Sequence, residues 1–499
     1  MKYIFILGQS TDLAKQELIN ILNKPNDKIE LIGQNFILAE TEQEAKKLMS
    51  ILGGTIKIAK YLDTIDNLDQ LDTKQWQSCL NLDKAKKNNY GFSLYNDSKK
   101  TWHYLYKLSL QLKKELKSQE YKARLVTGKQ DALSSVIIEK NNLLNNELLI
   151  IKNNNDYLLA ITEAIQDFAK YGHRDMNRPQ RDDRSGMTPP KVAQMMINLA
   201  GPDRQKNILD PFCGSGTILQ EAALQNFSQI FGTDNNKKTI SDAKANLDWL
   251  KTEYNFESNI NIQLADVKNL SKKFDANSID LIVTEPFMGD ARLLHNTNDT
   301  KTIQKINHEL QELYLSAFQE FKKILKTNSK IVFIFPILNI NNQKNYTIDV
   351  DNISKLGFEL QPPSIKSSQL SPAGNIIYSR DGQKVLREIT IWTSKIKPER
   401  NKEIARLMGK LERPLIAIQT CDPVAQKNIK RDNIKQESAL RLVREIKQEG
   451  WEVSTDVLCG LPGETYESHL KTLRIAFDVG FDFIDVGNVV MLPGSELEN

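Results

Sequence analysis

One run of the sequence, Asn207–Ala222, constrains the fold more than any other stretch. It predicts a short buried strand, a tight turn that carries Gly214 and Gly216, and a helix that opens at Thr217. Glycine is needed where a backbone turns sharply and a ligand approaches it closely. A second predicted strand follows and ends in Asp234. This succession predicts a ligand-binding βαβ unit in an α/β fold.

The charges beside the turn indicate what kind of ligand fits there. An acid placed as Asp234 is can bind the hydroxyls of a ribose, as in dinucleotide-binding units. The glycine spacing is not G-x-G-x-x-G, however, and Asp210 puts a negative charge where a pyrophosphate would otherwise sit. A cationic ligand that carries a ribose fits better. We therefore expect S-adenosylmethionine as the cofactor.

The run Asp210-Pro-Phe-Cys-Gly-Ser-Gly-Thr217 resembles the cofactor loop of class I methyltransferases that modify amino groups on nucleic acids. The resemblance implies that the loop holds the methionine part of the cofactor and that Asp234 binds the ribose. It also implies that Asp266 and Val267 meet the adenine ring. The expected cofactor-binding residues are Asp210, Pro211, Phe212, Gly214, Gly216, Asp234, Asp266 and Val267.

Length and composition set the broad class of the protein. A chain of 499 residues predicts roughly three domains, and 40% hydrophobic with 26% charged residues is an ordinary globular composition. The net charge of +4 means that any nucleic-acid surface must be local. The four cysteines lack disulfide or metal-ligand spacing, which suits a reducing compartment. No apolar run is long enough to span a membrane and the start is too short for a signal peptide, so we expect a cytoplasmic protein.

Changes in the pattern of predicted strands and helices along the chain indicate four parts. Residues 1–75 predict an α+β, ferredoxin-like domain, with strands at Lys2–Leu7, Leu31–Ala39 and Thr55–Ala59. The other three parts are a second α+β unit at 76–165, an α/β domain at 166–395 and a tail at 398–499.

The second unit carries a strongly basic stretch. A predicted helix places Leu105, Leu108, Leu112 and Leu116 on one face, and lysines dominate the sequence from Ser98 to Gln130. Such a basic face is either simply solvated or binds phosphates without reading sequence. The unit resembles the THUMP domain, an RNA-binding module of tRNA-modifying enzymes.

The junction Thr162–Ala200 supplies a second resemblance. Its string SGMTPPKVAQMMINLA closely resembles the approach to the catalytic domain in THUMP-linked tRNA guanosine methyltransferases. Arginines and aspartates alternate before it, including Asp182, Asp183 and Arg184. The two methionines, Met195 and Met196, are expected to fill the core.

Strands and helices alternate through the third part, as a parallel α/β fold requires. Strands are expected at Ile260–Asp266, Ile279–Pro286 and Lys330–Ile337, and an antiparallel pair is expected around the Asp381-Gly382 turn. Methyltransferases of this class end in such a pair. Because ligands bind at the carboxyl ends of parallel strands, the strand-end acids predict the position of the site. These acids are Asp210, Asp234, Asp266 and Glu285.

The candidate catalytic motif is Glu285-Pro286-Phe287. Amino-methyltransferases carry [DNS]-P-P-[YF] at this place. There, an acceptor side chain and a backbone carbonyl fixed by proline hold the hydrogens of a weakly nucleophilic amine, and an aromatic ring stacks on the base. This chain departs from the pattern, because Glu285 replaces Asp or Asn, Phe287 stands at the second proline and Met288 stands at the aromatic position. The sulfonium leaving group is already activated, so no metal is expected.

The leading hypothesis from these resemblances is a methyltransferase that acts on the 2-amino group of guanosine in tRNA. A DNA or ribosomal-RNA amino-methyltransferase is the alternative enzyme, and the THUMP-like unit disfavours DNA. A non-catalytic RNA-binding homologue that kept the cofactor fold is the alternative of another class.

The tail differs from the rest of the chain. Predicted strands at Pro414–Cys421, Trp451–Leu458 and Phe483–Leu492 alternate with helices at Glu437–Glu449 and Thr465–Val479. The phrases DVLCGLPGETYESHLKTL and VVMLPGSELEN resemble part of a radical S-adenosylmethionine barrel of the cobalamin-associated kind. The C-x-x-x-C-x-x-C motif that holds an iron–sulfur cluster in such enzymes is absent, so we assign the tail no iron–sulfur chemistry. Three strands cannot close a barrel, and we expect a partial (β/α) fragment.

Overall fold

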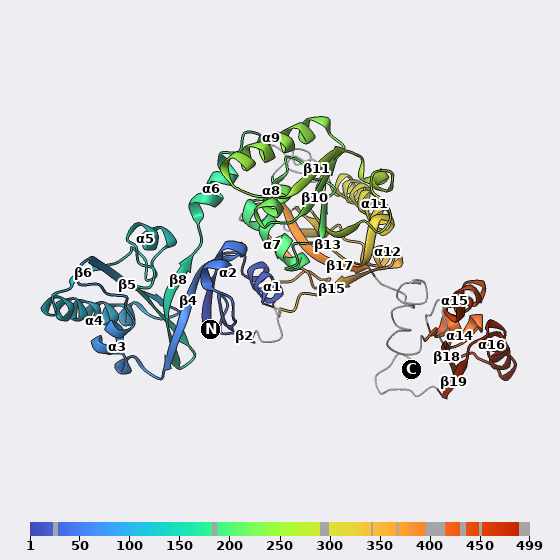
Figure 1. Ribbon diagram of the computed structural model, residues 1–499, viewed down its shortest axis with the longest axis horizontal. Helices are drawn as coiled ribbons and strands as arrows, with labels where there is room; N and C mark the ends of the chain where they lie inside the picture. Colours follow the sequence, from blue (N-terminus) through green and yellow to red (C-terminus); the bar gives the residue numbers. More distant parts are fainter. Residues whose placement is uncertain are drawn as a thin grey trace. The chain divides into compact units, whose positions relative to one another are not determined.

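The computed structural model describes residues 1–22, 28–181, 187–289, 299–340, 343–365, 367, 369–380, 382–394, 415–429, 436–448 and 452–488. The chain divides into two compact units, Met1–Ser394 and Lys395–Asn499. The first unit contains two sheets and their helices, and the second contains a small parallel sheet (Figure 1).

The N-terminal sheet has eight strands in the order β2-β3-β1-β4-β8-β7-β5-β6. Its strands are β1 Lys2–Leu7, β2 Lys28–Leu31, β3 Phe36–Glu40, β4 Thr55–Ile65, β5 Lys87–Tyr95, β6 Lys122–Val126, β7 Glu147–Asn153 and β8 Asp156–Ile165. Its helices are α1 Thr11–Ile21, α2 Ala45–Ile51, α3 Thr73–Ser78, α4 Lys99–Ser118 and α5 Ser135–Lys140. Because β4 pairs antiparallel with β8, strands from the expected units 1–75 and 76–165 belong to one continuous sheet.

The single strand expected at Leu31–Ala39 is wrong. The structure forms the antiparallel hairpin β2–β3 there, with Leu31 opposite Ile37. Residues 32–35 form the connection, and its turn residues Gly33, Gln34 and Asn35 are flanked by apolar residues that favoured one continuous strand in the prediction.

The second sheet follows the order β11-β10-β9-β12-β13-β17-β15, with β14 and β16 attached to β13 and β17. Its strands are β9 Asn207–Asp210, β10 Gln229–Asp234, β11 Asn259–Leu264, β12 Ile279–Thr284, β13 Leu325–Ile340, β14 Gln343–Tyr346, β15 Phe358–Gln361, β16 Ile376–Tyr378 and β17 Val385–Ser394. The strands from β11 to β13 run parallel, and β17 is antiparallel to β13. The predicted α/β class and the closing antiparallel strands are confirmed, although Asp381 lies outside the described residues.

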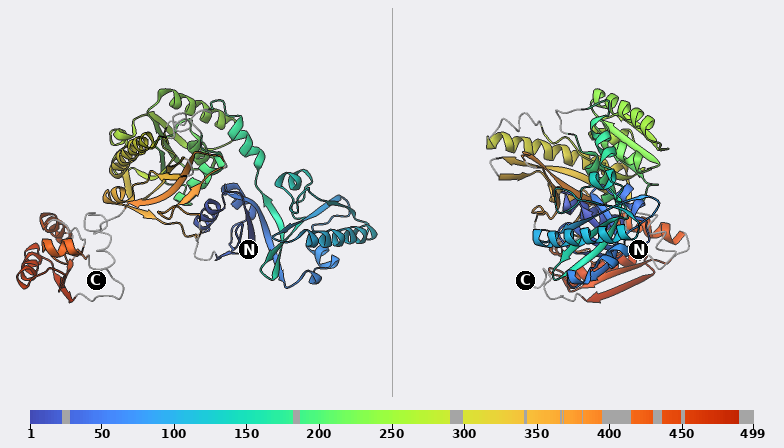
Figure 2. Two further views of the ribbon diagram at one scale, coloured as in Figure 1. Left: turned by 180° about the vertical axis from the view of Figure 1, so that it is seen from behind. Right: turned by 90° about the vertical axis from the view of Figure 1, so that its left-hand side faces the viewer.

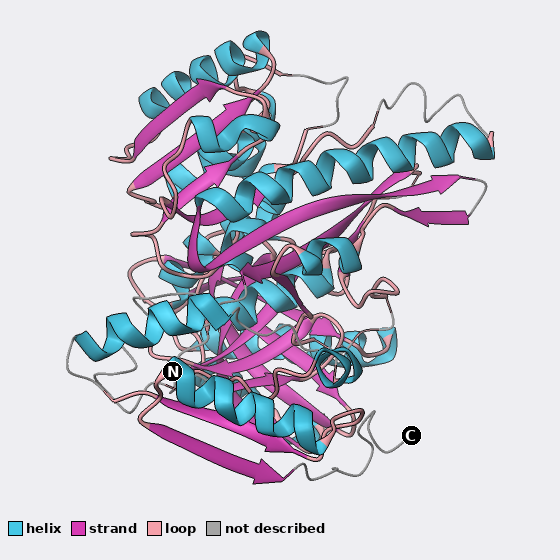
Figure 3. Ribbon diagram, turned by 90° about the vertical axis from the view of Figure 1, so that its right-hand side faces the viewer, coloured by secondary structure: helices cyan, strands magenta, loops and turns pink. Residues whose placement is uncertain are grey.

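Helices cover both faces of this sheet because its strands are apolar on both sides. Ile208 and Val283 face the cluster that contains α7 Pro190–Ala200, α8 Thr217–Leu224 and α9 Lys237–Glu253. Leu209 and Ile282, which are the strand neighbours of Ile208 and Val283, face the cluster with α11 Thr300–Ile324. The sheet and the helices on its two faces can be followed in Figures 2 and 3. In Figure 2, α11 is yellow and α9 is green. The remaining helical elements are η1 Leu68–Gln70, α6 Phe168–Met176, η2 Val267–Lys272 and α12 Val350–Lys355.

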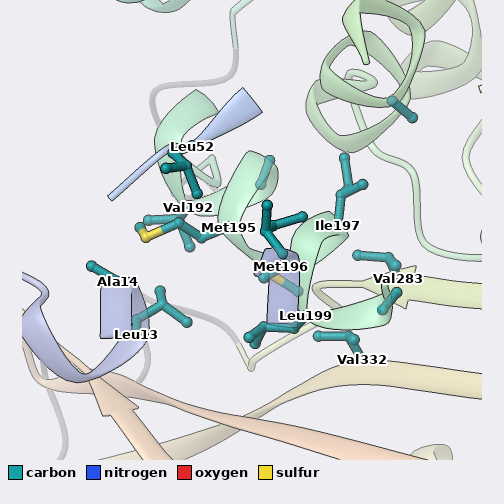
Figure 4. Packing of buried hydrophobic residues seen from close by; sticks show 14 of the residues in the cluster. Leu13, Ala14, Leu52, Val192, Met195, Met196, Ile197, Leu199, Val283 and Val332 are labelled. Atoms are coloured by element: carbon teal, nitrogen blue, oxygen red, sulfur yellow. The ribbon is translucent and has the colours of Figure 1, made fainter. Parts of the chain in front are cut away.

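Helix α7 joins the two sheets of the first unit. Figure 4 shows Val192 and Met195 among Leu13, Ala14 and Leu52 of the N-terminal part, while Leu199 of α7 lies near Val332 of the second sheet. Met195 and Met196 are buried in this cluster, which confirms their predicted role in the core.

A buried acid also connects α7 to the N-terminal part of the chain. The Glu17 carboxylate of α1 accepts hydrogen bonds from the backbone N–H groups of Gly53 and Gly54, each at 2.8 Å. It also accepts a 2.7 Å hydrogen bond from the Asn198 side chain of α7. Burial raises the pKa of Glu17 to about 7. A Cβ at Gly53 would lie 2.7 Å from the Lys191 carbonyl oxygen, so this loop must stay glycine to approach α7 closely.

The second unit contains a parallel β-α-β arrangement. Strands β18 Ser454–Cys459 and β19 Phe483–Asn488 pair in parallel and are connected through α16 Tyr466–Val479. The expected strand at Pro414–Cys421 appears only as bridges from Leu415 and Gln419 to β18. Two further helices are α14 Pro423–Asn428, which was not predicted, and α15 Gln436–Gln448. The part of the last predicted strand beyond Asn488 lies outside the described residues.

The buried ion pair between Lys57 on β4 and Glu147 on β7 provides a test of the N-terminal sheet. The Lys57 Nζ–Glu147 Oε1 distance is 2.8 Å, and both side chains are almost inaccessible. Lys57→Met would leave Glu147 charged and unpaired, so we expect a loss of about 3–5 kcal/mol in the free energy of unfolding, measured by urea denaturation.

Lys60→Met, at an exposed position on the same strand, is the control and should change little. The double variant Lys57→Met/Glu147→Leu should recover most of the lost stability. A Lys57→Met protein as stable as the control would contradict this account of the sheet.

Candidate active site

Three acids meet at the carboxyl ends of adjacent strands. Strand β9 ends at Asp210 and β10 ends at Asp234, while Glu285 directly follows the end of β12. These strands are neighbours in the order β10-β9-β12. Asp266 follows β11, the next strand beyond β10. The described structure therefore places the predicted strand-end acids along one edge of the sheet.

Asp210 is the most buried of these acids, with 2% of its surface exposed. Its Oδ1 accepts hydrogen bonds from the Thr284 hydroxyl at 2.6 Å and from the Phe212 N–H at 3.2 Å. Burial, together with the nearby charges of Asp234 and Glu285, raises the pKa of Asp210 to about 7. A cation placed here would reverse that effect, because it favours the ionised carboxylate.

The glycine turn lies directly against Asp234. Gly214 and Gly216 have φ values of +50° and +89°, in the left-handed region that favours glycine. The Gly214 N–H donates to Asp234 Oδ2 at 3.1 Å. A Cβ added to Gly216 would lie 3.3 Å from Ala243 Cβ, whereas one added to Gly214 would meet no described atom within 4 Å. Gly214 thus leaves open space beside an anchored carboxylate.

The other expected cofactor residues have different surroundings. Pro211 is buried, and its carbonyl accepts a 3.3 Å hydrogen bond from the Thr233 hydroxyl. Phe212 packs partly buried against the α11-side core. Asp266 is exposed, and its side chain accepts from the Lys268 N–H at the start of η2. Val267 is 4% exposed and packs in the same core as Phe212, so its side chain is committed to the fold.

Glu285 is held by two donors from distant parts of the chain. Arg387 Nε of β17 donates to Glu285 Oε1 at 2.6 Å, and the two side chains are 7% and 9% exposed. The Thr188 hydroxyl, just before α7, donates to Oε2. Pro286 is buried, whereas Phe287 is 58% exposed and its carbonyl accepts a 2.7 Å hydrogen bond from the Tyr314 hydroxyl.

Sequence reasoning missed four residues at this site, which are Thr188, Thr284, Tyr314 and Arg387. Thr188 lies within the conspicuous junction string, and Arg387 is a charged residue inside a predicted strand. Either feature could have been a signal, because a buried charge needs a partner. Nothing in the local sequence indicated that this partner is Glu285. Asp182, Asp183 and Arg184 lie outside the described residues.

The donor set fits S-adenosylmethionine. The ligand's positive charges suit a site where Asp210 and Asp234 repel one another, and its ribose hydroxyls suit the anchored, partly exposed carboxylate of Asp234. The open space beside Gly214 would admit the ligand close to the backbone.

Comparison with known families shows what the α/β part of the chain is similar to. Residues 178–340 match the family described as the RMKL-like methyltransferase domain. This part of the chain is similar to that methyltransferase domain. The match confirms the predicted class I methyltransferase resemblance and agrees with the expected S-adenosylmethionine cofactor.

Curated relatives are similar to this chain over part of their length. A tRNA (guanine(10)-N2)-dimethyltransferase of Methanocaldococcus jannaschii is 31% identical over 151 residues, which are 30% of this chain and 37% of that protein. A protein of the same name from Methanothermobacter thermautotrophicus is 33% identical over 104 residues, which are 21% of this chain and 28% of that protein. This chain thus spans about a third of the length of these relatives.

Solved structures give more distant similarities. TrmN from Thermus thermophilus superposes with a TM-score of 0.45 at 14% identity, covering 79% of this chain and 100% of that one. A possible methylase from Clostridium difficile gives a TM-score of 0.43 at 14% identity, covering 80% and 99%.

Residues 367–476 match the radical SAM superfamily, which confirms the predicted resemblance of the tail. The match begins within the first unit, before β16. An iron–sulfur cluster does not fit the tail, because its cysteines are Cys421 and Cys459 alone and neither has a second cysteine nearby in sequence. Among the described residues, no group of three or more His, Cys, Asp or Glu side chains could hold a metal ion, and no described helix is long and apolar enough to cross a membrane.

The pKa of Asp210 predicts pH-dependent cofactor binding in the wild-type protein. Ionised Asp210 attracts the cationic ligand and protonated Asp210 does not, so the affinity should increase as pH rises through about 7. If only the ionised form binds, the affinity for S-adenosylmethionine should increase about tenfold between pH 6 and pH 8 in calorimetric titrations. S-adenosylhomocysteine, which lacks the sulfonium charge, should show a smaller increase.

Asp210→Asn is the matched variant. Both observed hydrogen bonds fall on Oδ1, which asparagine retains, so the loop should keep its conformation. We expect weaker binding that no longer changes with pH beyond the ligand's own titration. An unchanged pH slope in Asp210→Asn would show that another group causes it.

Proposed function

We propose that this protein transfers methyl groups from S-adenosylmethionine to the exocyclic 2-amino group of guanosine in tRNA. The observation that carries the proposal is the Glu285 carboxylate, held at the end of β12 beside the buried Asp210 of the cofactor loop. The names of the curated relatives support the nucleotide and the atom.

The proposed mechanism begins with a weak nucleophile. The lone pair of the guanine 2-amino group is delocalised into the ring, so the amine must be oriented before it can react. Glu285 would accept one amine hydrogen, and the Pro286 carbonyl would accept the other, which aims the lone pair away from the protein. The bound cofactor supplies a methyl group on a sulfonium, which needs no metal activation. The nitrogen would form the new N–C bond as the bond between the methyl carbon and sulfur breaks, so that the sulfonium leaves as a neutral thioether and the amine loses one proton to water.

Of the two residues at the aromatic end of the motif, only Phe287 is assigned a role. Phe287 is exposed, and the Tyr314 hydroxyl fixes its backbone carbonyl. We propose that the Phe287 ring covers the extruded base, the task of the aromatic residue in related motifs. Met288 is partly buried against the α7-side core and takes no part in this proposal.

The 76–165 unit is proposed to bind the tRNA through phosphates. Helix α4 buries Leu105, Leu112 and Leu116 and turns its lysines outward, and Trp102 stacks on Tyr106 at 5.2 Å between ring centroids. Phosphate contacts of this kind position an RNA without reading its sequence. A tRNA substrate also supports the expected cytoplasmic location.

The first test of the proposed function is the identity of the methylated nucleoside. Unmodified tRNA incubated with the protein and methyl-labelled S-adenosylmethionine should yield labelled N2-methylguanosine in nucleoside mass spectrometry. Glu285→Gln should lower the rate by about 100-fold or more, because the amine loses its charged acceptor. Label in DNA, ribosomal RNA or adenosine would favour the alternative enzyme, and cofactor binding without transfer to any nucleic acid would favour the non-catalytic homologue.

Salt dependence tests the role assigned to α4. Replacing Lys113 and Lys117 with alanine should weaken tRNA binding and reduce the slope of log affinity against log salt by about 1–2. The double variant Lys46→Ala/Lys47→Ala on α2 removes the same charge from another exposed helix and is the control. Equal effects of the two double variants would contradict a specific role for α4.

Deletion of residues 398–499 tests whether the tail contributes to methylation. The division into two compact units predicts that the remaining protein transfers methyl groups at an unchanged rate. Phe477 and Val486 in the second unit are exposed at 70% and 55%, so the shortened protein should also be more soluble. A loss of methylation would show that the tail takes part in the activity, and iron–sulfur absorbance in reconstituted full-length protein would overturn the view that it lacks a cluster.

A further inference from the structure

The ion pair between Arg387 and Glu285 is the least expected feature of the site. Arg387 lies on β17, opposite Pro336 of β13 and Tyr378 of β16. Its Nε donates to Glu285 Oε1 at 2.6 Å, and its guanidinium carbon lies 5.9 Å from the centre of the Tyr378 ring. The side chain is buried, with its guanidinium near the Tyr378 ring and bonded to the candidate catalytic acid.

The length of Glu285 explains why such a partner is needed. Glutamate has one more rotatable bond than the aspartate or asparagine usual at this place, and free rotation would spread its carboxylate over several positions. Arg387 fixes one oxygen and the Thr188 hydroxyl fixes the other, so the carboxylate is held from two sides. Each carboxylate oxygen can accept a second hydrogen bond, so the amine can still bind.

Charge gives a second reason for the pair. Glu285 lies close enough to Asp210 to influence its ionisation, and Asp234 adds a third negative charge. A lysine in place of Arg387 would keep the charge but lose the planar guanidinium, whose rigid donors define a direction.

From this geometry we infer that Arg387 is a positioning residue for methyl transfer, which sets the Glu285 carboxylate in the orientation that accepts the amine hydrogen. The inference rests on the proposed function and extends it to a residue outside the motif. Arg387 acts through Glu285, whereas Glu285 itself contacts the amine.

Full-length wild type, Arg387→Met, Arg387→Lys, Glu285→Gln and the double variant Glu285→Gln/Arg387→Met form the test. With saturating tRNA and cofactor, Arg387→Met should lower kcat by about 100-fold while KM for tRNA and the calorimetric affinity for S-adenosylmethionine change less than about twofold. Arg387→Lys should lie between Arg387→Met and wild type. The double variant should be about as slow as Glu285→Gln alone, because both changes remove the same function.

Arg380→Met is the control, since Arg380 is exposed near the end of β16 and bonds to the Tyr378 hydroxyl rather than to Glu285. Millimolar guanidinium should restore part of kcat in Arg387→Ala but not in Glu285→Gln, a rescue that a purely structural role would not produce. The double variant also removes the buried charge that Arg387→Met leaves unpaired, so a folding defect in the single variant would be recognised.

The outcomes separate this inference from the proposed function. If wild type methylates guanosine and Arg387→Met behaves like Arg380→Met, the inference is wrong and the proposed function stands. If the label appears on adenosine while Arg387→Met still lowers kcat, the inference stands and the proposed substrate is wrong. If Arg387→Met and Glu285→Gln act additively, or wild type methylates no nucleic acid, the positioning role is overturned.

Discussion

The arrangement of the site depends on one electrostatic constraint, the crowding of carboxylates at the ends of parallel strands. Asp210, Asp234 and Glu285 lie on three adjacent strands, and their mutual repulsion is part of what raises the pKa of Asp210. The protein compensates the three carboxylates to different extents. Arg387 compensates Glu285 within the protein, and the Gly214 N–H anchors Asp234. Asp210 accepts only neutral donors in the described structure, which makes it the acid that a cationic cofactor would benefit most.

The same site links elements that are far apart in the sequence. Thr188 precedes α7, which packs between the two sheets of the first unit, and Arg387 belongs to the last long strand of the catalytic sheet. Both donate to one carboxylate. The N-terminal sheet reaches α7 through Glu17, whose bonds to the Gly53 loop and to Asn198 join the two parts in a buried polar contact. The orientation of Glu285 therefore depends on the packing of α7 as well as on β12.

Local sequence signals predicted the strand–turn–helix of the cofactor loop, the strand-end acids and the closing antiparallel strands. These features depend on glycine conformation and on alternation of apolar residues, which short windows contain. The β2–β3 hairpin was missed because apolar residues flank a short polar turn. The Arg387–Glu285 pair was missed because it spans 102 positions and exists only when β17 is placed in the sheet. The burial of Val267 was equally invisible, since a resemblance assigns a position and not the direction of a side chain.

The central claim is that the strand-end acids form an S-adenosylmethionine site, and calorimetric titration of the full-length protein with the cofactor tests it most directly. The account predicts saturable one-site binding to the wild type. It also predicts a large loss of affinity in Asp234→Ala, because that change removes the carboxylate assigned to the ribose. No binding to the wild type, or equal affinity in Asp234→Ala, would contradict the account.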